Sequence, residues 1–242
     1  MTERCPDENG WLSSANAWID RMGEEGDFAR KYILDHLMIP RILNEKPANM
    51  LDIGCGEGRF CRVIGEQNVE VTGIDPVDSF INHAKSRDPR GNYQCCFAES
   101  LPFADESFDL VVFYLSLIDI TDLQAAIREA TRVLRPNGRV LIANLTSFTT
   151  SNGTTGSVIG RDGKVYYPLG SYLEERANWF EWGGLRIRNW HRPLSTYISS
   201  LLDAGLVLTY FDEPKPIGGP HDSVEKYNKV PFVMMMEWKK PL

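Results

Sequence analysis

The sequence predicts an α/β fold, a doubly wound and mostly parallel sheet with helices on both faces. Three observations point to this fold. Short apolar runs typical of buried strands alternate with helical runs, a glycine-rich loop follows the first of those strands, and 242 residues suffice for one large core. Strands that alternate with helices favour right-handed crossovers and therefore parallel pairing.

The expected elements follow one another along the first 145 residues. Apolar residues at helical spacing predict an N-terminal helical region at 15–43, ended by Pro47. Strands are expected at 50–53, 69–74, 93–97 and 108–115, with helices at 58–65 and 78–87. Thr121 and Gln124 form a predicted capping box that starts the next helix. A Pro-Asn-Gly turn at 135–138 then leads into a strand at 139–145.

The alternation breaks after Leu145. Residues 146–163 are rich in Ser, Thr and Gly, and residues 166–191 are rich in aromatic side chains. Within the aromatic segment, "NWFEW" and "LRIRNW" flank Gly183 and Gly184 and predict a hairpin. The core is expected to resume with a helix at 194–204, a strand at 206–211 and a final strand at 232–238.

Charge and composition exclude several classes of partner. The formal net charge is -7, with 33 acidic against 26 basic residues and no long Lys/Arg run, so we expect no nucleic acid partner. The N-terminus lacks the features of a secretory signal, and no apolar segment approaches the ~20 residues that cross a membrane. The five cysteines show no zinc-site spacing, and we expect most of them to be buried. These features predict a cytoplasmic protein without a membrane or metal site.

The glycine loop "LDIGCGEGRF" indicates which cofactor the fold holds. A dinucleotide-binding loop, G-x-G-x-x-G, needs its last glycine where the helix packs closely on the strand, and Arg59 stands at that place. The loop therefore argues against NAD and against a nicotinamide-dependent oxidoreductase. Asp75, in "VTGIDP" at the end of the second strand, could accept hydrogen bonds from both hydroxyls of a ribose. Asp75 alone therefore fits NAD as well as any other cofactor that contains a ribose.

The wider motif set resembles the class I S-adenosylmethionine (SAM) methyltransferases. The residues that carry the resemblance are D-x-G-x-G-x-G from Asp52, "FAESLPFADESFDLVVFYLSLIDI" and "ATRVLRPNGRVLIANL". They are most similar to the group of ubiquinone, menaquinone and natural-product small-molecule methyltransferases. The resemblance implies a seven-stranded Rossmann-like sheet with an antiparallel last strand. It also implies methyl transfer from SAM to an O, N or C atom of a small molecule, with S-adenosylhomocysteine (SAH) as product.

The same resemblance implies a set of cofactor-binding residues. Asp52, Gly54, Gly56 and Gly58 are expected at the methionyl end, Asp75 and Pro76 at the ribose, Ala98 and Glu99 at the adenine, and Tyr114 near the sulfonium. Phe97 departs from the pattern, because family members often carry an Asp there. The chain is expected to be one domain with an N-terminal helical lid (1–47), a SAM-binding core (48–145), an insertion that caps the substrate (146–192) and the end of the core (193–242).

Catalytic and substrate-binding residues are less clearly marked in the sequence. His191, just before a helix that begins near Pro193, and Asp119 are candidate bases, although each could instead be structural. The candidates for substrate binding are Tyr32, His36, Tyr172, Trp182 and Arg188. A tRNA-modifying methyltransferase, a non-catalytic SAM-binding protein and, less favoured by the glycine loop, a nicotinamide-dependent oxidoreductase remain open as alternatives. The oligomeric state is not predicted.

Overall fold

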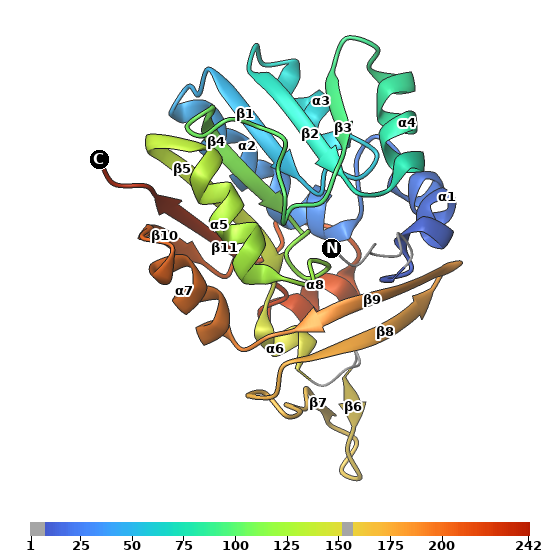
Figure 1. The fold of residues 1–242 in the computed structure, drawn as a ribbon. Helices are drawn as coiled ribbons and strands as arrows, with labels where there is room; N and C mark the ends of the chain where they lie inside the picture. Colours follow the sequence, from blue (N-terminus) through green and yellow to red (C-terminus); the bar gives the residue numbers. More distant parts are fainter. Residues whose placement is uncertain (1–7, 152–156) are drawn as a thin grey trace.

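The computed structural model describes residues 8–151 and 157–242, and its centre is a seven-stranded sheet (Figure 1). Along the sheet the strands are β10 (Val207–Asp212), β11 (Val233–Lys239), β5 (Leu134–Leu145), β4 (Phe108–Tyr114), β1 (Asn49–Ile53), β2 (Glu70–Asp75) and β3 (Asn92–Cys95). Strand β11 pairs antiparallel with β10 and β5, and the remaining pairs are parallel. The predicted fold class is confirmed.

Helices cover both faces of the sheet because successive strand residues point to opposite sides. On β1, Leu51 and Ile53 pack in the cluster of α5 (Leu123–Val133) and α7 (Leu194–Asp203). Met50 packs in the opposite cluster. That second cluster is formed with η1 (Arg30–Leu34), α2 (Asp35–Asn44) and α3 (Arg59–Gly65).

Two further helices frame the region beyond the C-terminal ends of the parallel strands. Helix α4 (Asp78–Arg87) follows β2, and α1 (Trp11–Met22) lies against it. A small cluster of Ala15, Val77, Phe80 and neighbouring aromatic residues joins the two helices. Helix α8 (His221–Tyr227), which the sequence patterns did not predict, lies between β10 and β11 in the chain.

The segment after β5 forms the predicted insertion. It contains α6 (Ser147–Thr150), the short pair β6 (Val158–Ile159) and β7 (Val165–Tyr166), and the long hairpin of β8 (Arg176–Trp182) and β9 (Leu185–His191). The hairpin turn falls at Gly183 and Gly184, both with positive φ, as the sequence predicts. Figure 1 shows this hairpin extending away from α6 to α1.

Two local predictions were wrong. The cap of α5 is Asp122, whose side chain accepts a hydrogen bond of 2.9 Å from the Ala125 N–H, and not Thr121. The Pro-Asn-Gly segment at 135–138 lies inside β5 as a bulge, with Asn137 at φ 63°, because its N–H bonds to the Lys240 carbonyl of the neighbouring chain segment.

Removal of this cap has a defined expected cost. We expect Asp122→Ala to lower the free energy of unfolding by about 1 kcal/mol, because one N-terminal amide of α5 loses its acceptor. Urea denaturation measures the change, and Thr121→Ala, one residue earlier, is the control with a smaller loss. A larger loss in Thr121→Ala would instead support the capping box.

Candidate functional site

A large pocket lies at the carboxyl ends of the central strands. It encloses about 1180 Å³ of empty space, including its open mouth. The walls come from the ends of β1, β2 and β4, from the segment after β3, and from residues around α1. Strands β1 and β4 are neighbours where the strand order reverses, which is the usual ligand crevice of such sheets. Among the predicted site residues, those on the pocket wall are Asp52, Gly54, Gly56, Asp75, Pro76, Ala98, Glu99, Tyr114 and Asp119.

The glycines of the loop have different structural roles. Gly54, Gly56 and Gly58 all have positive φ, between 54° and 82°, where other residues are strained. A Cβ on Gly54 would lie 2.4 Å from the Ser116 side chain, so close packing excludes one. At Gly56 the nearest atom to such a Cβ is 3.9 Å away, so the backbone there lies open to the pocket. Gly58 precedes α3 as its N-cap and is not on the pocket wall.

Asp75 ends β2 and ties two parts of the wall together. Its Oδ2 accepts a hydrogen bond of 3.0 Å from the Gly56 N–H, and its Oδ1 accepts one of 2.9 Å from the Val77 N–H. Burial raises the pKa of Asp75 to about 6, although both backbone bonds act in the opposite direction. A carboxylate offers about four acceptor positions, so each oxygen can accept a further donor.

Asp52 lies one residue before the end of β1 and is the more isolated of the two carboxyls. The Cys61 thiol donates to its Oδ2 at 3.3 Å, while Oδ1 is buried without a hydrogen-bond partner. Burial raises the pKa of Asp52 to about 7. A buried polar atom without a partner is rare and costly, which indicates that a donor absent from the polypeptide belongs there.

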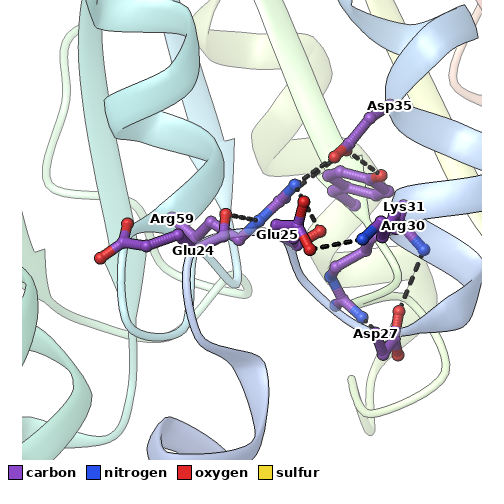
Figure 2. A network of polar contacts seen from close by, with 8 residues as sticks. Glu24, Glu25, Asp27, Arg30, Lys31, Asp35 and Arg59 are labelled. Atoms are coloured by element: carbon purple, nitrogen blue, oxygen red, sulfur yellow. Dashed lines mark hydrogen bonds and ion pairs between the residues drawn. The ribbon is translucent and has the colours of Figure 1, made fainter.

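Arg59 explains why the third glycine of a dinucleotide motif is missing. Its guanidinium donates to the carbonyls of Glu24 and Glu25 at 3.0 and 3.1 Å and pairs with Asp35. Figure 2 shows this arginine in a polar network with residues of the N-terminal segment. The side chain thus points from the start of α3 to the N-terminal segment and holds the residues after α1 beside the glycine loop.

The N-terminal segment supplies wall residues that sequence reasoning missed. They are Glu8, Asn9, Trp11, Trp18, Met22 and Arg30. The Arg30 guanidinium lies 5.2 and 5.4 Å from the ring centroids of Trp18 and Tyr114 and donates to Asp27 at 3.0 Å. Trp11 falls before the apolar pattern that predicts a helix from residue 15, so the pattern gave no signal for it.

Tyr114 links this segment to the end of β4. Its hydroxyl donates to Asp35 Oδ1 at 2.7 Å, and its ring packs edge-on against Phe60 with the centroids 4.5 Å apart. Burial, and then the neighbouring Asp35 carboxylate, raise the pKa of Tyr114 well above its ordinary value. Tyr114 is therefore a protonated donor at neutral pH.

Comparison with known proteins identifies the core. Residues 51–142 match the family model described as a methyltransferase domain. The core of this chain is a methyltransferase domain. A demethylmenaquinone methyltransferase of Thermotoga maritima is 28% identical over 207 residues, which cover 81% of this chain and 84% of that one.

Two further similarities support the same family. A malonyl-[acyl-carrier protein] O-methyltransferase of Pseudescherichia vulneris is 33% identical over 111 residues, and the match covers 46% of this chain and 44% of the relative. The chain therefore spans less than half the length of that relative. The crystal structure of an S-adenosylmethionine-dependent methyltransferase from Mesorhizobium loti has a TM-score of 0.73 at 21% identity, with 90% and 100% of the two chains covered. This second similarity shows the fold of the methyltransferase domain.

Asp119 lies on the wall of the methyltransferase domain's pocket, in the loop after β4. The Asn189 side-chain amide donates to its Oδ1 at 2.6 Å. Burial raises the pKa of Asp119 to about 7, while hydrogen bonds from Trp11 and Asn189 act to lower it. Of the two predicted bases, Asp119 is the one that the structure brings to the pocket.

His191 is a correction, because the structure places it outside the pocket wall in a structural position. It is fully buried, with Nδ1 2.8 Å from the Thr150 hydroxyl and Nε2 2.9 Å from the Tyr172 carbonyl oxygen. Nε2 must donate to that carbonyl, and Nδ1 accepts from Thr150, so neither nitrogen is available to a substrate. Burial also lowers the pKa of His191.

The five predicted substrate-binding residues are likewise absent from the pocket wall. Trp182 is at the hairpin tip and 38% exposed, the Tyr172 hydroxyl accepts the Leu194 N–H, and Tyr32 packs on Phe28. His36 lies in α2 with Nδ1 buried and unpartnered. Arg188 does not line the pocket, but it donates hydrogen bonds to two residues that do, Glu8 at 3.0 Å and Thr121 at 3.4 Å. No described residue of 146–192 lines the pocket, so the insertion is not its roof; the N-terminal segment is.

The hairpin instead supports that roof from behind. Ser14 of α1 and Arg186 of β9 exchange two hydrogen bonds of 3.2 and 3.0 Å, and the Arg188 N–H donates to the Asn9 carbonyl at 2.9 Å. The arginines on and after β9 are engaged with other groups of the protein: Arg186 with Glu181, Arg188 with Glu8, and Arg192 with backbone carbonyls.

Proposed function

We propose that this chain is a SAM-dependent methyltransferase that acts on an O, N or C atom of a small molecule. The observation that carries the proposal is one pocket whose wall contains Asp52, with its buried and unpartnered carboxyl oxygen, the open backbone of Gly56 and the Asp75 carboxylate. SAM carries an ammonium, a carboxylate and a ribose, and these residues complement those groups. The family match and the names of the relatives support the same activity.

Each end of the pocket suits one part of this cofactor. Asp52 would accept the ammonium, and Arg30, within 6 Å of two wall aromatics, would face the carboxylate. Asp75 would accept the ribose hydroxyls beside Pro76. Ala98, Phe97 and Phe80 would enclose the adenine. Glu99, whose Oε1 accepts the Asp122 N–H at 3.3 Å, lies on the same wall and would lie near the adenine amino group.

The protein's part in the reaction is positioning, water exclusion and proton transfer. When bound, SAM supplies an electrophilic methyl group on its sulfonium. The N-terminal segment closes the pocket with Trp11, Trp18 and Met22, which keep water away. Asp119, with its pKa near neutrality, would accept the proton of an attacking hydroxyl or amine.

The charge of the wall limits the acceptor molecule. Two arginines line the pocket, Arg30 and Arg59, and both are paired with carboxylates, Asp27 and Asp35. Six carboxyl side chains line it, of which Glu8 and Glu57 are paired with arginines and the others are Asp52, Asp75, Glu99 and Asp119. An anionic acceptor would be repelled, so we propose a neutral or cationic small molecule. The acidic net charge of -7 argues against nucleic acid as the acceptor.

The described chain also bears on where and how the protein works. No helix among residues 8–151 and 157–242 is long and apolar enough to cross a membrane. Cys55, Cys61, Cys95 and Cys96 are free thiols, which favours a cytoplasmic location. Only Cys55 and Cys61 are buried, so the expectation that most cysteines are buried holds for half of these four; Cys5 lies outside the described residues. We propose one methyltransferase domain with the described residues 8–47 as its lid, and residues 1–7 of the expected lid lie outside the described residues.

Calorimetry with the intact protein tests this function. We expect SAM and SAH to bind with dissociation constants in the low-micromolar range, about -8 kcal/mol, and NADH not to bind. Transfer of tritium from methyl-labelled SAM to small molecules of a deproteinised extract then tests the activity. Binding of NADH without SAM would contradict the cofactor, and SAM binding without transfer to any fraction would favour a non-catalytic binding protein.

A further inference from the structure

The loop that carries Asp119 is held by the hairpin strand β9 and the residues just after it. The contacts join residues about 70 positions apart in the chain: Trp190 N–H to Ile118 O (2.6 Å), Arg192 to Leu117 O, Ile120 O and Thr121 O (3.0, 2.6 and 3.1 Å), and Asn189 to Asp119 (2.6 Å). Asn189 and Arg192 are 7% and 2% exposed, so water does not compete for these bonds. The loop therefore has its conformation set by β9.

One of these contacts reaches the reactive group itself. Four hydrogen bonds from Trp190 and Arg192 hold backbone carbonyls of the loop, whereas the Asn189 amide donates to the carboxyl of Asp119. A donor to a carboxylate stabilises its ionised form and also fixes the direction of its second oxygen. Of these contacts, the bond from Asn189 is the one that reaches a carboxyl group.

We infer that Asn189 is a positioning residue for methyl transfer, which holds the Asp119 carboxyl in a fixed orientation and favours its ionised, proton-accepting form. The inference rests on the proposed function, because it assigns a supporting residue to the proposed base. An amide suits this place better than an arginine or a lysine. It donates a hydrogen bond without adding a positive charge beside a cationic cofactor.

Asn189 is one of two hydrogen-bond donors that lower the pKa of Asp119, and Trp11 is the other. The groups that face Asp119 are the Trp11 side chain from α1, Asn189 from β9, the Asp75 carboxylate from β2 and Arg30 from η1. Glu8 and Glu99 share the pocket wall. Burial and the neighbouring carboxylate of Asp75 favour the protonated form, while Trp11, Asn189 and Arg30 favour the ionised form. Removal of Asn189 takes away one of the groups that stabilise the ionised form of Asp119, so the pKa of Asp119 should rise.

Asn178 offers a matched control on the same hairpin. It is the direct cross-strand partner of Asn189 on β8, and its side-chain nitrogen is buried without a hydrogen-bond partner. Asn178→Ala therefore removes an amide of the same kind from the same place in the hairpin without a bond to Asp119. Any general loosening of the hairpin should affect both variants.

The test is a carbon-13 NMR titration of aspartate carboxyls in the full chain, with the Asp119 signal assigned from Asp119→Asn. We expect the pKa of Asp119 to rise by about one unit in Asn189→Ala and to stay unchanged in Asn178→Ala. Asn189→Asp, which keeps the shape and adds a negative charge, should raise it further, and it serves if the alanine variant does not fold. An Asp119 pKa that is unchanged in both Asn189 variants, or equally shifted in Asn178→Ala, overturns the inference.

Calorimetry with SAH separates this inference from the proposed function. Asn189 is not among the residues of the pocket wall, so Asn189→Ala should keep its SAH affinity within about threefold of the native value. If native protein failed to bind SAH, the proposed function would fail, whatever the titration shows. If SAH binds and the Asp119 pKa does not respond to Asn189, only the positioning role fails.

Discussion

Asp75→Ala is expected to weaken SAH binding by about 1.5–3 kcal/mol, that is, roughly 10- to 150-fold. Two causes add. The ribose loses a charged acceptor, and the N–H groups of Gly56 and Val77 lose theirs, so the glycine loop is less well ordered before binding. Calorimetry at pH 7.5 measures the change.

A control separates loss of the site from loss of charge. Asp203 is an exposed carboxylate at the end of α7, away from the pocket wall, and Asp203→Ala should leave SAH affinity unchanged. Circular dichroism establishes that both variants are folded. Native affinity in folded Asp75→Ala would mean that the ribose lies elsewhere.

Asp52→Asn is expected to change binding and stability in opposite directions. The amide cannot balance the charge of an ammonium, so SAM binding should weaken by about 1.5–3 kcal/mol. The free protein should become more stable, by on the order of 2 kcal/mol at pH 8, because a buried carboxyl with one unpartnered oxygen is replaced by a neutral group of the same shape. A site that costs stability until its ligand binds is common in enzymes.

The sign of the pH dependence follows from the raised pKa of Asp52. The folded protein holds the proton up to about pH 7, whereas the unfolded chain releases it near 3.8. The stability contributed by the protonated carboxyl is therefore full below about pH 4 and is lost as the pH rises to about 7. The stability advantage of Asp52→Asn should accordingly grow between pH 5 and pH 8.

Cofactor binding should show the opposite trend with pH. An ammonium favours the ionised carboxyl, so native SAM affinity should increase as the pH rises through about 7, with a proton released on binding. In Asp52→Asn this increase should be smaller, and what remains would come from Asp75 and Asp119. Thermal unfolding with and without SAM at pH 5, 6.5 and 8 measures both effects. Equal pH dependence in the native and variant proteins would show that Asp52 does not titrate in this range.

The regular part of the fold was predictable because local patterns carry it. The nearly continuous apolar runs in "NMLDI" and "FDLVVFY" are typical of strands buried on both faces of a sheet. The spacing of Leu123, Ile127 and Ala130 gives α5 its buried stripe. The N-cap of α5 was less predictable, because Thr121 and Asp122 are both residue types that suit an N-cap. Which of the two caps the helix depends on the residue at which the backbone becomes helical.

The sequence by itself determined the doubly wound fold and the order of the glycine loop, Asp52 and Asp75. Short-range chemistry fixes these features: glycines take positive φ, and acidic residues that end parallel strands meet at one edge. The sequence also left Arg59 where a third glycine would stand, which excluded the dinucleotide motif.

Only the tertiary structure decided what covers the pocket and which candidate base faces it. The roof depends on pairs such as Ser14 with Arg186, and the placement of Asp119 depends on Asn189, at separations of 172 and 70 residues. His191 and Asp119 look alike as candidates in the sequence, yet one has both nitrogens bonded inside the insertion and the other lies on the pocket wall. No local pattern encodes such contacts, because they arise from how whole elements pack against one another and not from the residues on either side.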